Sequence, residues 1–264
     1  DVVVSAAGGT GDPDDLPITM TSTNSAPSAA RMVGAWSVHA LTASGALWGL
    51  LAVLCIAQSE FREALLFMIV AIAVDSVDGM LARWVRVKET MPRFDGALLD
   101  NLVDYLNYVF VPAVFIHEAH LLPPSLALLS SIVICVASAY QLCQIDAKTD
   151  DHFFLGFPSY WNVVSFYLFL GQLDPRLNLA IVWFFVVMVF VRLKWVYPSR
   201  MVRFRGVTLL ATALWGATCI AMIVQYPTAT PWLLPASLVY VFYYVGLSLT
   251  LGRTATSSAH SSAS

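Results

Sequence analysis

The chain has 264 residues, of which 58% are hydrophobic and 12% are charged, and its mean hydropathy is +0.72. Soluble domains carry about 25% charged residues, so this composition excludes an ordinary soluble protein and indicates a membrane domain. The net charge of -3 offers no basic surface for nucleic acid. The four cysteines show no CxxC or Cys/His spacing, which argues against a disulfide framework and against a zinc site.

Both ends of the chain have a composition typical of disorder. Residues 1–32 are rich in Asp, Ser, Thr, Pro and Gly, and residues 253–264 are mostly Ser, Thr and Ala. The first segment has no basic stretch followed by an apolar one, so it does not resemble a secretory signal. We therefore expect a single membrane domain over residues 33–252, between a disordered amino-terminal arm and a disordered tail.

The middle of the chain is expected to form an all-α, polytopic membrane domain. Eight apolar stretches follow one another, and most approach the roughly 20 residues that a helix needs to cross a bilayer. The fifth and sixth are short and also fit a tilted or re-entrant pair, so we expect about eight transmembrane helices, with six as the lower bound. The stretches are 35–57, 64–84, 97–116, 126–143, 160–173, 177–191, 207–224 and 232–251.

Lys and Arg are distributed unevenly between the two sides of this arrangement. All of the 14 except Arg62 and Arg176 fall on the side of the amino terminus. Because cytoplasmic loops carry an excess of Lys and Arg, both termini are expected in the cytoplasm. The basic cluster of Arg200, Arg203 and Arg205 fits this pattern, with affinity for anionic headgroups, and it equally suits the phosphates of a lipid substrate.

Residues 75–104 place acidic and small side chains on one face of each of two consecutive predicted helices. At about 100° per residue, the first helix presents one sector of about 140° that contains Asp75, Asp78, Gly79, Ala82 and Arg83. The next helix repeats such residues every four positions, at Gly96, Asp100 and Asp104. The small residues would let the helices approach closely or let a ligand reach the backbone.

Four carboxylates on facing stripes require a positive partner, because an ionised side chain at bilayer depth costs at least about 2.5 kcal/mol and neighbouring carboxylates repel one another. Arg83 supplies one positive charge, whereas one or two divalent cations supply two or four. Oxygen ligands suit Mg²⁺ or Mn²⁺. We therefore predict a divalent-metal site at Asp75, Asp78, Asp100 and Asp104. Solvated helix ends or structural ion pairs would explain a single such aspartate better than they explain four.

These positions match a known signature, DxxDGxxAR followed by GxxxDxxxD, and the chain therefore resembles the CDP-alcohol phosphatidyltransferases. All eight specified residues are present between Asp75 and Asp104. The spacer from Trp84 to Asp95 has twelve residues and is longer than is usual in the family. The long spacer and the FPSYWN segment at residues 157–162 resemble one subgroup, the bacterial phosphatidylcholine synthases. The resemblance covers nearly all of the chain between its two ends.

The resemblance implies a transferase of phospholipid biosynthesis in the bacterial inner membrane, with its active site facing the cytoplasm. It implies transfer of the phosphatidyl group of CDP-diacylglycerol to choline with release of CMP, at two magnesium or manganese ions held by the four aspartates. Asp104 would also be the general base. The residues implied for the CDP-diacylglycerol pocket are Asp78, Gly79, Ala82, Arg83 and Gly96.

The acceptor site is predicted from the chemistry of choline. Its quaternary ammonium cannot donate hydrogen bonds, so a site for it should offer aromatic faces. Tyr105 and Tyr108 lie next to the predicted base, and Tyr160 and Trp161 lie in the FPSYWN segment. All four also fit the aromatic belts found at membrane interfaces.

Two other functions fit part of the same pattern. A related phosphatidyltransferase could use serine, glycerol phosphate or inositol phosphate, and the arginines near residue 200 would suit a phosphorylated acceptor. A cation-coupled transporter is a more distant alternative, because acids among membrane helices often mark ion pathways. Transporter sites usually lie at the midplane between broken helices, whereas these acids are predicted near helix ends. The sequence leaves the number of subunits open, and it admits a homodimer.

Overall fold

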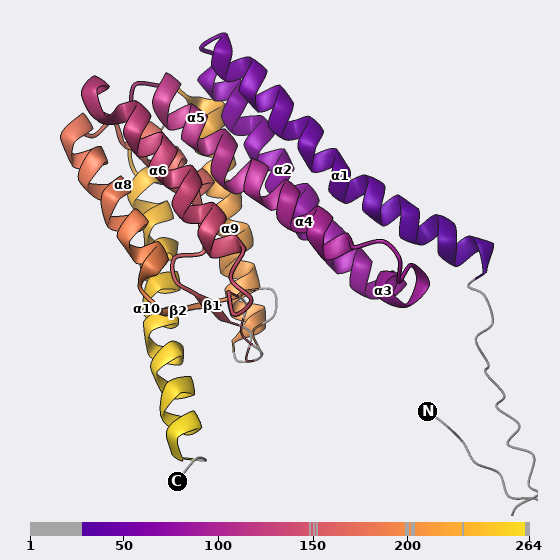
Figure 1. The fold of residues 1–264 in the computed structure, drawn as a ribbon. Helices are drawn as coiled ribbons and strands as arrows, with labels where there is room; N and C mark the ends of the chain where they lie inside the picture. Colours follow the sequence, from indigo (N-terminus) through magenta and orange to yellow (C-terminus); the bar gives the residue numbers. More distant parts are fainter. Residues whose placement is uncertain are drawn as a thin grey trace, which may run out of the picture.

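The computed structural model describes residues 28–147, 149, 151, 153–198, 201, 204–228 and 230–261, with side chains up to residue 252. The predicted arm therefore lies outside the described residues except for 28–32, and so do Arg200 and Arg203. The elements in chain order (Figure 1) are α1 (Ala29–Ala57), α2 (Phe61–Val85), α3 (Val87–Thr90), α4 (Gly96–Asp104), η1 (Tyr105–Phe110), α5 (Val111–Glu118), α6 (Pro124–Leu142), β1 (Phe153–Leu155), α7 (Trp161–Gly171), α8 (Pro175–Phe190), β2 (Lys194–Val196), α9 (Arg205–Gln225) and α10 (Leu233–Ser261).

Among the described residues, six helical stretches are long and apolar enough to cross a membrane: α1, α2, the continuous run Gly96–Glu118 through α4, η1 and α5, then α6, α9 and α10. The helices α7 and α8 are shorter, as expected for the fifth and sixth apolar stretches. The predicted all-α, polytopic class is thus confirmed at the lower bound of six long helices. Helix α10 continues to Ser261, beyond the point where a disordered tail is predicted to begin.

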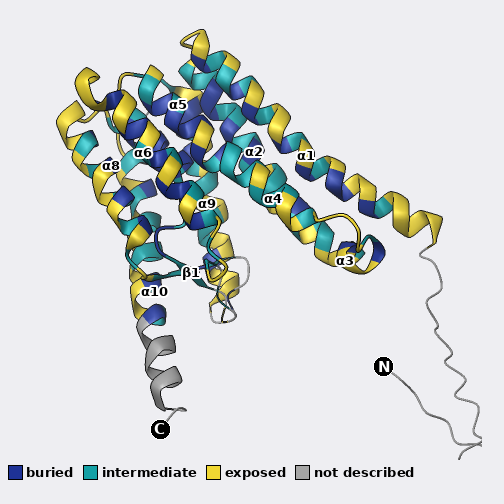
Figure 2. Cartoon of the chain, viewed as in Figure 1, coloured by how far each residue is buried: buried dark blue, intermediate teal, exposed yellow. Residues whose placement is uncertain are grey.

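The outer faces of the helices are apolar and exposed. Leu128 and Val136 on α6, Leu214 on α9 and Phe242 on α10 have exposed fractions of 61%, 65%, 62% and 73%. Figure 2 shows that buried residues gather between the helices while exposed ones cover their outward sides. Such a surface would favour aggregation in water, but it is the surface expected of helices whose neighbours are lipid chains.

Helix α1 packs closely against the segment that carries Asp100 and Asp104. A Cβ atom at Gly45 would lie 2.5 Å from Val103 Cγ1, and one at Gly49 would lie 2.5 Å from Asn107 Oδ1. The buried Asn107 side chain donates from Nδ2 to the Gly45 carbonyl oxygen at 3.0 Å. Only residues without a side chain permit this approach, so the two glycines set the position of α4 and η1 relative to α1.

Replacing Gly45 with Ala is therefore expected to destabilise the fold by about 1–3 kcal/mol, because the added methyl group would overlap Val103. The matched control is Gly216→Ala in α9, where an added Cβ would meet nothing within 4 Å. The control should be neutral or slightly stabilising, since Ala favours a helix over Gly. Thermal unfolding in detergent measures both variants, and equal stability of the two would contradict the packing described for α1.

The strands β1 and β2 form a short antiparallel ribbon, in which Phe154 pairs with Trp195 and which no pattern in the sequence predicted. Lys194 Nζ lies 2.7 Å from Asp151 Oδ2 and so ties the segment before β1 to β2. Partial burial raises the pKa of the Asp151 carboxyl, but hydrogen bonds, including the one from Lys194, hold it below its usual value. Tyr244 on α10 donates its hydroxyl to the Val196 carbonyl oxygen at 3.0 Å. The ribbon is thus anchored to the segment before β1 and to α10.

The start of α1 and the end of α10 lie toward the same end of the helical bundle, which is also the end that carries α3 and the ribbon (Figure 1). A chain that crosses the membrane an even number of times starts and ends on the same side of it. The assignment of that end to the cytoplasm stays a prediction based on its excess of Lys and Arg.

Candidate active site

Three of the four predicted aspartates come together. Asp75 and Asp78 on α2 and Asp100 on α4 each offer one carboxylate oxygen, and these oxygens all lie within 4.8 Å of one another. Asp78 is buried, with 3% of its surface exposed. The i, i+3 spacing on α2 places two of the carboxylates on one face, and the packing of α4 supplies the third.

The donor set of this cluster fits a hard divalent cation. All its ligand atoms are carboxylate oxygens, as Mg²⁺ and Mn²⁺ prefer. Three ionised groups at this spacing inside a membrane protein repel one another unless a cation lies between them. The cluster could therefore hold a metal ion. The number of ions and their identity stay predictions.

Asp104 does not join this group of three within the described part of the chain. It is the last residue of α4, one turn beyond Asp100, and its charge acts on the Tyr108 hydroxyl in η1. The Tyr108 hydroxyl donates to Asp75 Oδ2 at 2.8 Å. Tyr108 is thus near both the metal cluster and Asp104. The position of Asp104 next to the cluster is compatible with a function other than holding the same metal ion.

The wide turn after Asp104 is a feature that the sequence pattern did not reveal. Residues Tyr105–Phe110 form the π-helix η1 instead of continuing α4 as an α-helix. Such turns are frequent at functional sites because they change the direction of the side chains that follow them. Here the turn accompanies the inward placement of Tyr108 and Asn107, each bonded to a neighbouring helix.

Thr42 on α1 is a contributor that sequence reasoning missed. It is buried, and its hydroxyl lies within hydrogen-bonding reach of the Asp78 carboxylate and of the Val38 carbonyl oxygen, the latter at 3.2 Å. Because an ionised acceptor makes the stronger bond, we expect the single hydroxyl proton to go to Asp78. A threonine in an apolar run carries no signal of this role, since only the packing of α1 on α2 brings it to the site.

Thr42→Val is expected to weaken metal binding about 10-fold, because groups that orient a metal ligand commonly contribute that much to affinity. Thr42→Ser keeps the hydroxyl and should stay close to the unmodified protein. The measurement is a titration of detergent-solubilised protein with Mn²⁺. Equal affinities for the valine and serine variants would show that the hydroxyl does not orient Asp78.

Comparison with known proteins places this site in a family. A sequence profile described as CDP-alcohol phosphatidyltransferase matches residues 38–150, which include the aspartate cluster and Thr42. A phosphatidylcholine synthase of Legionella pneumophila is 41% identical over 221 residues, covering 81% of this chain and 87% of that protein. This chain belongs to the CDP-alcohol phosphatidyltransferase family.

Further relatives in the family are also named phosphatidylcholine synthases. A phosphatidylcholine synthase of Pseudomonas aeruginosa is 40% identical over 215 residues, covering 81% of this chain and 90% of that protein. One of Borreliella burgdorferi is 32% identical over 221 residues, covering 83% of this chain and 93% of that protein. The similarity thus extends well beyond the signature itself, to most of the length of each protein.

Both glycines of the family signature lie close to other side chains. A Cβ atom at Gly79 would lie 3.6 Å from Arg83 Nη1, so the guanidinium group folds back over the glycine while remaining exposed. A Cβ atom at Gly96 would lie 2.6 Å from Cε1 of the buried His39 on α1. Gly96 therefore serves a close helix approach. Ala82 is half-buried one turn beyond Asp78.

The structure divides the four aromatic candidates for the acceptor site into two pairs. The ring centres of Tyr108 and Tyr160 lie 6.1 Å apart, beside Asp75. Trp161 is completely buried, and its Nε1–H donates to Ser138 Oγ at 2.8 Å, so its ring belongs to the core. The Tyr105 hydroxyl donates to a backbone carbonyl oxygen of α6 at 3.3 Å.

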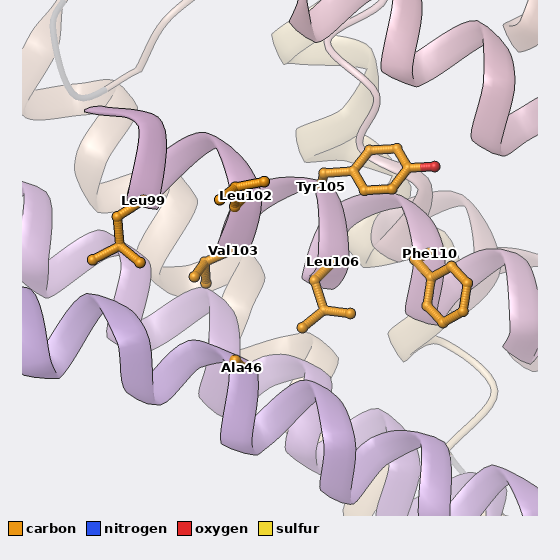
Figure 3. A pocket seen from close by; sticks show the side chains of 7 residues that line it. All are labelled: Ala46, Leu99, Leu102, Val103, Tyr105, Leu106 and Phe110. Atoms are coloured by element: carbon orange, nitrogen blue, oxygen red, sulfur yellow. The ribbon is translucent and has the colours of Figure 1, made fainter. Parts of the chain in front are cut away.

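Tyr105 also lines an apolar hollow on the outer flank of α4 and η1. The hollow has a volume of about 510 Å³, and it opens outward, since Leu102 and Phe110 on its wall are 62% and 42% exposed. None of the clustered carboxylates lines it, and its shape and apolar walls suit lipid chains. Figure 3 shows the lining side chains: Ala46, Leu99, Leu102, Val103, Tyr105, Leu106 and Phe110.

Proposed function

We propose that this chain is a CDP-diacylglycerol–choline O-phosphatidyltransferase, which transfers the phosphatidyl group of CDP-diacylglycerol to choline and releases CMP. The observation that carries the proposal is the group of three carboxylates within 4.8 Å in a chain whose relatives along most of its length are named phosphatidylcholine synthases. The cluster accounts for the phosphate chemistry, and the relatives favour choline over serine or a phosphorylated polyol.

The reaction forms one bond and breaks one. The choline oxygen attacks the phosphorus that carries diacylglycerol, the bond from that phosphorus to the CMP oxygen breaks, and the choline proton goes to a base. We assign the base to Asp104, which ends α4 one turn beyond the clustered Asp100. A carboxylate is a weak base for an alcohol, so close positioning of the hydroxyl must contribute much of the rate.

Asp75, Asp78 and Asp100 would hold divalent metal, which we propose to be two ions of magnesium or manganese with Asp104 as an additional ligand. When bound, the metal would neutralise the pyrophosphate oxygens and the charge that develops on CMP. Arg83, folded over Gly79 on the same helix face, is suited to pair with a substrate phosphate. Asp78, Ala82 and Gly96 complete the proposed nucleotide pocket. Tyr108 and Tyr160 would face the ammonium group of choline.

The proposed setting is the inner membrane of a bacterium, with the cluster toward the cytoplasmic end of the bundle. Choline and CDP-diacylglycerol would then meet at the surface where the charged nucleotide stays in water. The excess of Lys and Arg on the side of the termini supports this orientation.

The test is CMP release from radiolabelled CDP-diacylglycerol by purified protein in mixed micelles, with choline, serine, glycerol phosphate or inositol phosphate as the acceptor. We expect release with choline and only background release with the others, together with labelled phosphatidylcholine as the product. Release that requires serine or a phosphorylated polyol and ignores choline would overturn the choline assignment while leaving the family membership unaffected.

A further inference from the structure

A third aromatic ring extends the pair of Tyr108 and Tyr160. The ring of Phe154 in β1 lies 6.3 Å from that of Tyr160, at an angle of 82°. The Tyr108 and Tyr160 rings are inclined at 50° to each other. The three rings therefore form walls that face in different directions instead of a flat stack. The series begins at Asp75, which accepts the Tyr108 hydroxyl.

We propose that Phe154 determines acceptor specificity by forming, with Tyr108 and Tyr160, an aromatic site for the quaternary ammonium group of the acceptor. This inference rests on the proposed function, and it adds a residue that lies outside the family signature. Phe154 would touch the ammonium methyl groups of the bound alcohol.

The chemistry of the surroundings suits a methylated cation. All three rings are half-buried, in contrast to the completely buried core ring of Trp161, so each retains surface for a ligand. The Tyr108 hydroxyl is taken up by Asp75, so the face of the ring and not its hydroxyl remains for a ligand. An ammonium group beside these rings would gain attraction to their faces without needing to donate a hydrogen bond.

Contacts within the ribbon and with the residue that follows it fix the position of Phe154. Its ring lies 4.6 Å from the ring of Tyr197, which follows β2, at an angle of 32°. The strand pairing of Phe154 with Trp195 fixes the backbone, and the Lys194–Asp151 pair closes the ribbon at 2.7 Å. A rigid aromatic wall loses little conformational freedom when a ligand binds, which favours affinity.

The neighbouring residue offers a matched control. Successive side chains of a strand point to opposite faces, so Phe153 faces away from Phe154. Its ring lies instead beneath Lys194, whose Nζ is 5.5 Å from the ring centre. Replacing either phenylalanine with Leu removes an aromatic face from the same strand and keeps an apolar side chain of similar size.

The experiment compares choline with its uncharged isostere 3,3-dimethylbutan-1-ol as acceptors for the unmodified protein, Phe154→Leu and Phe153→Leu. We expect Phe154→Leu to raise KM for choline about 10-fold and to lower the preference for choline over the isostere by a similar factor. KM for CDP-diacylglycerol and kcat at saturating choline should change less than about twofold. Phe154→Tyr, which keeps the aromatic face, should restore the preference.

A merely structural role predicts a different result. Disturbed packing would lower turnover of the two equally shaped acceptors alike, so an unchanged choline preference in Phe154→Leu would overturn the inference. An equal loss in Phe153→Leu would also overturn it. Should Phe154→Leu not fold, Tyr160→Leu tests the same site from the amino-terminal end of α7. We expect it to lower the preference for choline over the isostere, and an unchanged preference would overturn the inference.

The two proposals fail in distinguishable ways. If the unmodified protein does not release CMP in response to choline, the proposed function is wrong and this inference falls with it. If the unmodified protein uses choline and the variants keep its preference for the charged acceptor, only the aromatic site is wrong.

Discussion

Asp104→Asn is expected to lower choline-dependent CMP release by at least about 100-fold, because an amide of the same shape cannot accept the proton of the attacking hydroxyl. The three clustered carboxylates remain, so the variant should still bind Mn²⁺ and be stabilised by it against heat. The loss should therefore appear in kcat and not in folding. Single-turnover release of CMP from labelled CDP-diacylglycerol measures it.

The matched control for this variant is Asp95→Asn on the same helix. Asp95 caps α4 by accepting the Leu98 amide at 2.9 Å, and Asn caps helices equally well. The control should retain nearly full activity. Unchanged turnover in Asp104→Asn would contradict the assignment of the base, and loss of Mn²⁺ binding there would make Asp104 primarily a metal ligand.

Removal of divalent metal is expected to abolish CMP release, and Asp78→Asn is expected to weaken metal binding more than 10-fold. Without metal the variant should melt at a higher temperature than the unmodified protein, because the one buried charge among three neighbouring carboxylates is gone. With metal the order should reverse, because bound metal stabilises only the intact cluster. Thermal unfolding in detergent with EDTA, Mg²⁺ or Mn²⁺ measures both effects.

Glu63→Gln on the same helix is the matched control for the metal experiment. Glu63 pairs with Arg62 at 3.6 Å near the start of α2, far along the helix from Asp78, and is partly exposed. It should show the same response to metal as the unmodified protein. Full activity of the unmodified protein after exhaustive chelation would rule out the metal role of the cluster.

The helical spacing of Asp75 and Asp78 was sufficient to predict that they share a face, because three residues nearly complete one turn whatever surrounds the helix. The same local rule placed Asp100 and Asp104 on one stripe. The apolar stretches also predicted the long helices, since the thickness of a bilayer sets a minimum length that can be counted along the chain. Both kinds of inference depend only on residues close in sequence. The structure confirms the long helices, whereas the packing of α4 was needed to bring Asp100 to Asp75 and Asp78.

Packing between distant segments decided the remaining features of the site. The separation of Asp104 from the cluster accompanies a π-helical turn whose Asn107 bonds to Gly45 on α1, and Thr42 reaches Asp78 only because α1 lies against α2. Phe154 meets Tyr160 through a ribbon whose strands lie about forty residues apart in the sequence. No local periodicity encodes such pairings, because their free energy arises when complementary surfaces from separate helices and loops meet.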